Sequence, residues 1–523
     1  MKRKKLFFVI IFNLFLADRV LSQVTFQKTF GVSNYGFGWS VHQTSDGGYI
    51  LANYTSVLWA GSFSVSLIKT NYLGDTLWTK IYATASDGEG LAVQQTTDGG
   101  YIIAGSTYFG FGASDFFLIK TDSIGDTLWA KTYGGVDGEI AKSVQQTLDG
   151  GFVIGGRTQG FGAGGRDFYL VKTDSIGNLQ WSKSYGGSAY DNGESAQQTK
   201  DGGYIFAGYT LSFGMGGWDF LLIKTDANGD TLWVKTYGGI SNDYGYCVKQ
   251  ADDGGFIICG STYLTQLSPL AASLIKTDSL GNLVWSKLVV SNNAVFGYSM
   301  QIRDSTKFII GASGNGLGNN LMALVRPFPY SSIMQVYNTA TPFLHGAAVD
   351  TTSDGGYIFA GTTDGFSGWE EAYLIKTDAG LSSGCFETFH LAGGNNDSTR
   401  VTNPAVQIMS GGVAGSLSVQ TGSGSGVVTH CLSVVGVESF PFNNLINISP
   451  NPSFGNITIT LPNNLQNGFI EIYSLLGEKL FKENIFNEST KEINVENISS
   501  GIYFVKVFDG KKSYCKKLIV EHD

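Results

Sequence analysis

The side chains that could bind a metal or act as acid, base or nucleophile are poorly spaced for those roles. His42, His345, His390, His430 and His522 stand in no HExxH, HxH or Cys/His pattern of a zinc site. The GxSxG string at residues 380–384 opens a Ser/Gly-rich stretch, whereas a nucleophile elbow needs a strand before it and a helix after it. No P-loop lysine motif occurs among the many glycines. We therefore expect no metal and no cofactor, and we identify no catalytic residue.

Aromatic residues in irregular loops are better candidates for a site, and the chemistry they suggest is binding. Trp, Tyr and Phe beside Asp and Asn suit the faces and hydroxyls of sugars, or a protein partner. An alternative interpretation is that these rings only fill the mouth of the fold. The candidate ligand-binding residues are Tyr35, Trp59, Phe109, Phe161, Tyr190, Trp218, Tyr244 and Trp369.

These loops lie within and between the copies of one repeated unit. The string DGGYI or a variant begins at Asp46, Asp98, Asp149, Asp201, Asp253 and Asp354, with a degenerate copy at Asp304, so that the period is 50 to 52 residues. Strings close to LIKTD and LWxK recur in phase with it. Each unit holds four strand-like runs joined by Gly- and Asp-rich turns, for example 92–96, 101–105, 116–121 and 127–133. Seven such units predict an all-β fold, a seven-bladed β-propeller over residues 23–379.

The two ends of the repeat array predict ring closure. The seventh unit lacks its LWxK strand, and residues 24–31 (VTFQKTFG) match the pattern of that strand (TLWAKTYG). We therefore expect the N-terminal strand to complete the seventh blade and to remove an open sheet edge.

Residues repeated in every unit are expected to be structural. We expect the recurring Lys to pair with a carboxylate such as Asp115, Asp167 or Asp219, and the five LWxK tryptophans to pack between blades. Two interpretations of the glutamines that recur three positions before each turn stay open: hydrogen bonding between blades, or the lining of a polar channel. These glutamines are Gln43, Gln95, Gln146, Gln198, Gln250 and Gln301.

Composition and charge exclude several classes of protein. The 523 residues include 71 Gly without a Gly-X-Y period, which excludes collagen, and the 42% hydrophobic content excludes bulk disorder. The excess of 43 acidic over 34 basic residues argues against a nucleic-acid-binding surface. Residues 1–22 combine four early basic residues with a short apolar run, which is typical of a secretory signal peptide. No later apolar run is long enough for a membrane helix.

Residues 380–444 lose the repeat. Their Ser/Gly/Thr-rich composition predicts a linker, a flexible or strand-like spacer. Cys385 and Cys431 bracket it, and the sequence leaves open whether they form a disulfide. Cys247 and Cys259 fall on neighbouring strands of one unit, which predicts buried thiols.

Residues 445–523 alternate apolar and polar residues with regular turns, the pattern of a small Ig-like β-sandwich. Here the chain resembles the C-terminal sorting domain of the type IX secretion system of Bacteroidetes, on a passenger similar to those with DGG repeats. The matching motif residues are Pro450, Asn451, Pro452, Gly477, Gly501, Tyr503 and Lys517.

The resemblance implies that the type IX secretion machinery is a partner and that the protein is secreted or attached to the outer-membrane surface. It implies no activity for the passenger. We expect a binding protein for a glycan or a surface protein. The alternative is an extracellular polysaccharide lyase or hydrolase with carboxylates at the propeller mouth.

Overall fold

The computed structural model describes residues 23–31, 36–56, 63–83, 88–108, 113–263, 270–290, 294–304, 307–315, 319–325, 332–338, 347–363, 371–384, 387–395, 400–402, 407–410, 413–416, 420–423, 426–435, 446–465, 468–474, 479–508 and 513–521. These residues form strands and turns and contain no helix. Accordingly, no helix among them has the length and apolar character needed to cross a membrane. The chain divides into a larger unit, Val24–Ser433, and a smaller unit formed mainly by Val434–Asp523.

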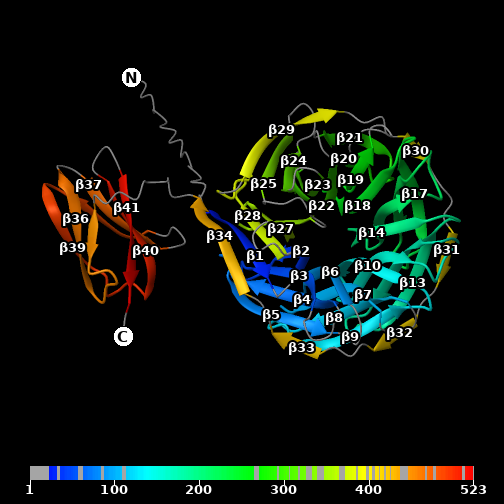
Figure 1. The fold of residues 1–523 in the computed structure, drawn as a ribbon, viewed down its shortest axis with the longest axis horizontal. Coiled ribbons are helices and arrows are strands. Elements are labelled where there is room, and N and C mark those ends of the chain that lie inside the picture. Colours follow the sequence, from blue (N-terminus) through cyan, green and yellow to red (C-terminus); the bar gives the residue numbers. More distant parts are fainter. Residues whose placement is uncertain are drawn as a thin grey trace, which may run out of the picture. The chain divides into compact units, whose positions relative to one another are not determined.

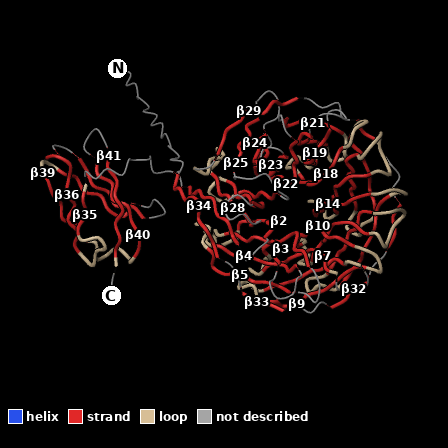
Figure 2. Tube along the Cα trace, viewed as in Figure 1, coloured by secondary structure: helices blue, strands red, loops and turns tan. Residues whose placement is uncertain are grey.

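The larger unit holds seven groups of four antiparallel strands placed one after another around a central axis (Figures 1 and 2). In the first six groups the strands follow the order of the sequence, and the first strand of each lies nearest the axis (Figure 1). The first three groups consist of β2 (Gly36–Gln43), β3 (Tyr49–Ser56), β4 (Phe63–Thr70) and β5 (Thr76–Ala83); β6 (Gly88–Gln95), β7 (Tyr101–Thr107), β8 (Asp115–Thr121) and β9 (Thr127–Gly134); and β10 (Glu139–Gln146), β11 (Phe152–Thr158), β12 (Asp167–Thr173) and β13 (Leu179–Gly186).

The remaining four groups repeat this arrangement. Groups four to six consist of β14 (Asp191–Gln198), β15 (Tyr204–Thr210), β16 (Asp219–Thr225) and β17 (Thr231–Gly238); β18 (Asp243–Gln250), β19 (Phe256–Tyr263), β20 (Leu270–Thr277) and β21 (Leu283–Val290); and β22 (Ala294–Asp304), β23 (Lys307–Asn315), β24 (Asn319–Val325) and β25 (Ser332–Asn338). Group seven contains β26 (Ala347–Thr351), β27 (Tyr357–Thr363), β28 (Glu371–Thr377) and the N-terminal strand β1 (Gln23–Gly31).

The aspartate of each DGG turn organises the hairpin between the first two strands. Asp46 Oδ1 accepts hydrogen bonds from Gly48 N at 3.0 Å and from Thr44 Oγ1 at 2.6 Å, while Gly47 takes a φ of +81° that favours glycine. Lys69 Nζ, almost wholly buried, lies 2.8 Å from Asp46 Oδ2. The same ion pair recurs in five other groups, as Lys120–Asp98, Lys172–Asp149, Lys224–Asp201, Lys276–Asp253 and Lys376–Asp354.

This pairing corrects the expected partners of the repeated lysines. Asp115 begins the same strand that Lys120 nearly ends, so the two lie roughly 16 Å apart along β8. The turn aspartate is close to the lysine because the first hairpin and the end of the third strand lie at the same rim. The lysine therefore pairs with its own DGG turn.

Successive groups are joined by one repeated contact from an outermost strand to the turn between the third and fourth strands of the next group. Trp129 packs against Gly177, Tyr133 Oη donates to the Gly177 carbonyl at 2.6 Å, and Lys131 Nζ donates to Asn178 Oδ1 at 2.7 Å. The tryptophan and tyrosine contacts recur at three further junctions, with Trp78 and Tyr82, Trp181 and Tyr185, and Trp233 and Tyr237. These tryptophans pack between groups, as expected.

The N-terminal strand makes the same contact, which closes the ring. β1 pairs with β28 in antiparallel register from Phe26 opposite Lys376 to Phe30 opposite Ala372. Phe26 packs on Gly74, where the other junctions have tryptophan, and Lys28 Nζ lies 2.6 Å from Asp75 Oδ1. The expectation that residues 24–31 supply the missing fourth strand is confirmed.

The Ser/Gly/Thr-rich segment after the repeats contains strands. We call β29 (Glu387–Asn395), β30 (Arg400–Thr402), β31 (Gln407–Ser410), β32 (Val413–Ser416), β33 (Gln420–Ser423) and β34 (Gly426–Val435) the belt. β29 pairs with both β21 and β25, and the next four strands pair with β17, β13, β9 and β5 in turn. β34 then lies beside β1. The belt thus runs back around the ring and pairs with the outermost strand of all seven groups (Figure 1).

The smaller unit consists of two antiparallel sheets around its own core. One contains β35 (Asn447–Ser449), β36 (Asn456–Leu465) and β39 (Glu488–Asn494). The other contains β37 (Gly468–Ser474), β38 (Lys479–Ile485), β40 (Gly501–Phe508) and β41 (Ser513–Val520). Ile457, Ile472, Val505 and Leu518 are fully buried in the cluster that joins the two sheets.

Candidate functional site

Six of the seven innermost strands contain a β-bulge at the same position. The pairing of the first and second strands shifts by one residue between Gly38 and Ser40, and the equivalent shift recurs in the next five groups. A bulge adds one residue to a strand and redirects its side chain, and bulges are common beside functional sites. The residues at these positions, which we call the bulge row, are Trp39, Leu91, Lys142, Glu194, Tyr246 and Tyr298.

The bulge row is chemically varied although its neighbours are nearly uniform. The residue before the bulge is small because the adjacent group approaches closely: a Cβ on Gly193 would lie 2.2 Å from the Gly156 carbonyl oxygen. The residue after it is also small and is often a serine that binds the next group, as in the 2.9 Å hydrogen bond from Ala196 N to Ser143 Oγ. The strand is thus fixed on both sides of a side chain that varies from group to group.

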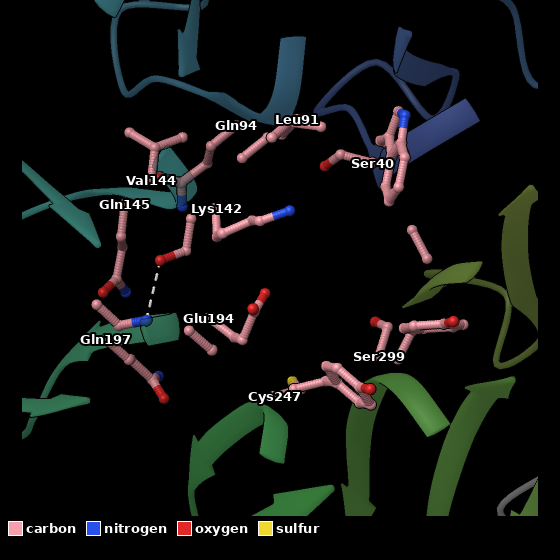
Figure 3. A pocket seen from close by; sticks show the side chains of 18 of the residues that line it. Ser40, Leu91, Gln94, Lys142, Val144, Gln145, Glu194, Gln197, Cys247 and Ser299 are labelled. Atoms are coloured by element: carbon pink, nitrogen blue, oxygen red, sulfur yellow. Dashed lines mark hydrogen bonds between the residues drawn. The ribbon is translucent and has the colours of Figure 1, made fainter. Parts of the chain in front are cut away.

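All six bulge-row residues line one cavity of about 260 Å³ on the ring axis. Figure 3 shows Lys142 and Glu194 extending from neighbouring strands into this cavity. Lys142 Nζ also lies 5.7 Å from the ring centroid of Trp39. Tyr246 and Tyr298 lie with ring centroids 5.0 Å apart. The cavity therefore offers an aromatic wall beside an acid and a base.

Burial and nearby cations act in opposite directions on the pKa of the Glu194 carboxyl. Burial raises its pKa, whereas the charges of Lys142 and Arg157 and a hydrogen bond from Tyr209 oppose the rise. Glu194 is the one carboxylate among the described lining residues, while Lys142 and Lys249 both line the cavity. The described wall therefore carries more cationic than anionic side chains.

Three positions beyond the bulge, a second set of side chains lines the cavity, and we call this set the amide row. Its members are His42, Gln94, Gln145, Gln197, Lys249 and Gln301. Gln94, Gln145 and Gln197 each accept a hydrogen bond at Oε1 from a backbone N–H of the next group, at 2.7, 2.7 and 3.1 Å.

The glutamines at the following position bind in the opposite direction around the ring. Gln146 Oε1 accepts from Thr97 N at 2.9 Å, and Gln43 Oε1 accepts from Ser353 N at 2.6 Å across the junction of the seventh and first groups. Gln95, Gln198 and Gln250 repeat the contact. Hydrogen bonding between groups is therefore confirmed for these repeated glutamines, and Gln301 both lines the cavity and donates to Asp350.

Both carboxylate oxygens of Asp350, in the seventh group, accept hydrogen bonds. Its Oδ2 lies 3.1 Å from His42 Nδ1 and accepts from Gln43 N at 3.2 Å, and its Oδ1 accepts from Gln301 Nε2 and Thr351 N. Although burial would raise the pKa of Asp350, His42, Gln43 N and the charge of Lys249 hold it below its usual range. This carboxylate joins groups six, seven and one.

Half of the aromatic residues predicted to bind ligand fall within the described part of the chain. Tyr35, Trp59, Phe109 and Trp369 lie outside it. Phe161 packs on Tyr169, with ring centroids 5.8 Å apart, and belongs to a core cluster. Tyr190 is 47% exposed and lies under the Arg166 guanidinium at 5.5 Å.

Trp218 and Tyr244 are connected to the cavity through other rings. Tyr209 lies 5.0 Å from Trp218 and 5.2 Å from Tyr244, centroid to centroid, and 6.0 Å from the bulge-row residue Tyr246. The predicted loop aromatics of groups four and five are thus continuous with the cavity wall. Sequence reasoning did not find the bulge row. The available signal was a varied residue between two small ones, as in Gly193-Glu194-Ser195.

The structure also describes other side chains that could bind a metal or act as a nucleophile. The described residues hold no cluster of three His, Cys, Asp or Glu arranged to bind a metal. Ser382, in the GxSxG string, lies in a turn where its N–H donates to Asp378 Oδ1 at 2.8 Å. Cys247 and Cys259 are opposite each other on β18 and β19 and are buried free thiols, as expected. Cys385 and the side chain of Cys431 lie outside the described residues.

In the smaller unit, the predicted motif residues connect its first and last segments. Asn451 Nδ2 donates to the Lys517 carbonyl at 2.8 Å, and Asn451 Oδ1 accepts from Ile519 N at 2.8 Å. Tyr503 Oη donates to the Ser499 carbonyl at 2.6 Å. Gly477 lies outside the described residues. Residues 447–521 match the family of the secretion system C-terminal sorting domain.

The C-terminal unit is a type IX secretion sorting domain. It marks the protein as secreted or attached to the cell surface, and it implies an interaction with the secretion machinery. In this sorting domain, Asn451 links the first Pro-Asn-Pro motif to the terminal Lys-Lys-Leu-Ile-Val strand, so the two most separated motifs form one structure.

Beyond the sorting domain, the similarity of the chain to known proteins is low. No curated protein matches the chain. Among solved structures, Sqt1 from Chaetomium thermophilum is similar at 8% identity and a TM-score of 0.35, over 67% of this chain and all of that one. A similarity at this level carries no argument about the passenger.

Proposed function

We propose that the passenger is a seven-bladed β-propeller that binds a ligand, a glycan or a surface protein, in the cavity formed by its bulge row. The observation that carries this proposal is the contrast within the repeat. The turns, ion pairs and junction contacts recur in most groups, whereas the six bulge positions hold five different residue types and all line the cavity. Variation on a rigid frame is typical of recognition sites.

The aromatic residues predicted from the sequence extend this site. Tyr209, Trp218 and Tyr244 form a continuous surface with Tyr246 and Tyr298, to which a sugar ring or an apolar side chain could bind. We include Tyr190 at the exposed end, beside Arg166. Tyr35, Trp59, Phe109, Phe161 and Trp369 stay predictions for the surrounding loops.

The enzymatic alternative has less support in the cavity. A glycoside hydrolase of the usual kind needs two carboxylates roughly 5–10 Å apart that are free to act. Both oxygens of Asp350 accept hydrogen bonds, and Glu194 is the one carboxylate of the described wall. The arrangement is better suited to binding.

The test is a glycan array and a surface-protein screen with the full chain and two lysine variants. Lys142→Met removes a cavity cation, whereas Lys200→Met removes an exposed lysine that pairs with Asp252 outside the cavity. We expect Lys142→Met to lower ligand affinity at least tenfold and Lys200→Met to leave it unchanged. Equal binding by both variants and the wild type would move the site away from the bulge row.

A further inference from the structure

The amide row contains an arc of side chains whose free ends are hydrogen-bond donors. A backbone N–H needs an acceptor, so the contacts to Gln146 N, Gln198 N and Gln250 N fix the oxygen ends of Gln94, Gln145 and Gln197. Their Nε2 groups are the ends that remain, and no hydrogen bond of the described residues uses them.

The arc continues into the fifth group. Lys249 lines the cavity at the same position, and an ammonium group has three donors and no acceptor. Four successive groups thus present a free donor group at one level of the cavity. Asp350, which contacts the amide-row residues His42 and Gln301, is not among the lining residues, and both of its oxygens are already occupied.

Donors without acceptors favour a ligand group that consists of acceptors. Carboxylates and sulfates offer oxygens that only accept, and hydrogen bonds to such charged groups are stronger than those between neutral partners. The cationic excess of the described wall, from Lys142 and Lys249 against Glu194, acts in the same direction.

The bulge row indicates what carries the anionic group. Tyr246 and Tyr298 provide aromatic faces, and Glu194 can accept from hydroxyls. Apolar ring faces and hydroxyl donors occur together on sugars. We infer that the cavity binds an acidic carbohydrate, with a uronate carboxylate or a sulfate ester held by Gln94, Gln145, Gln197 and Lys249. This inference rests on the proposed function.

The experiment is calorimetric titration of the full chain with three probes of equal length: an oligogalacturonate, a sulfated oligosaccharide and a neutral oligosaccharide. We expect at least one acidic probe to bind ten times more tightly than the neutral one, and the tighter of the two acidic probes identifies the source of the anion. Gln145→Glu keeps the acceptor for Gln198 N but replaces the free donors with a negative oxygen. It should weaken acidic binding at least tenfold.

The control is Gln146→Glu, one residue along the strand, whose side chain binds Thr97 N and Gly150 O and does not line the cavity. It should bind like the wild type. If Gln145→Glu does not fold, Gln94→Glu makes the same change in the second group. Equal affinity for acidic and neutral probes, or an unchanged affinity in the folded variant, overturns the acidic ligand while the proposed cavity site stands. An uncharged ligand from the array whose binding is weakened by Lys142→Met would also overturn the acidic ligand and leave the cavity site in place. If the protein binds no glycan and no protein, both proposals are wrong.

Discussion

The hydroxyl of Tyr185 should contribute a measurable and limited part of the ring's stability. It donates to the Gly229 carbonyl at 2.7 Å, and the tyrosine is fully buried at the junction between groups three and four. Tyr185→Phe removes this donor and leaves the buried Gly229 carbonyl without its side-chain hydrogen bond. A net hydrogen bond is worth about 1 kcal/mol, and an unsatisfied buried partner adds to the loss, so we expect a decrease of about 1–2 kcal/mol in the free energy of unfolding.

The seventh junction shows why the loss should not be larger. Phe30 of β1 occupies the position of this tyrosine, and that junction closes without a hydroxyl. Truncating the neighbouring aromatic, Trp181→Ala, should cost more, about 3–5 kcal/mol, because it leaves a cavity beside Gly229.

The assay is urea unfolding followed by tryptophan fluorescence. Tyr190→Phe, at a 47% exposed position, is the control and should change stability by less than about 0.5 kcal/mol. A Tyr185→Phe variant as stable as the wild type, or one that loses as much as Trp181→Ala, would refute the role assigned to the junction hydroxyl.

Three further predictions concern pH, closure and export. Burial, with the charge of Asp115, raises the pKa of Glu139 to about 7, so the folded state holds more protons than the unfolded state between about pH 4.5 and 7. The free energy of unfolding should therefore fall as pH rises through this window. Glu139→Gln should reduce the slope of the urea midpoint plotted against pH, and an unchanged slope would contradict this explanation. Deleting residues 24–31 removes the Lys28–Asp75 pair and exposes β28, so aggregation or loss of a single unfolding transition should follow in light scattering and calorimetry, and an unaltered transition temperature would show that β1 is dispensable. Removing residues 446–523 should leave the passenger in the periplasm, as judged by cell fractionation, and normal surface display of the shortened chain would be the contrary result.

The repeat and the N-terminal strand could be predicted because their signals are local and in phase. Asp46-Gly47-Gly48 predicts a tight hairpin wherever it occurs, and Gly47 has the positive φ that this requires. The match of Phe26 and Lys28 to Trp129 and Lys131 predicted a contact between the two ends of the repeat array.

Other features depend on geometry that spacing does not encode. The partner predicted for Lys120 was wrong because the sequence does not show at which rim of the ring a strand ends. The bulge at Glu194 changes which face a side chain occupies, and a one-residue shift is hidden within a regular pattern of alternation. The belt strands are three to ten residues long. Those from β30 to β33 have three or four residues, too few to show the apolar alternation that predicts a strand, and the outer edges of the strand groups make their pairing favourable.

The belt also determines how the protein responds to force. On a cell surface, a pull between the C-terminal side and the ring loads β34 first, then β33 and the shorter strands before it, since the belt follows the ring in the chain. These short strands can unpair one at a time while the four strands of each group stay together. Release from Glu387 to Val435 would lengthen the tether by roughly 150 Å. We therefore expect the belt to extend under load before the cavity lined by the bulge row is deformed.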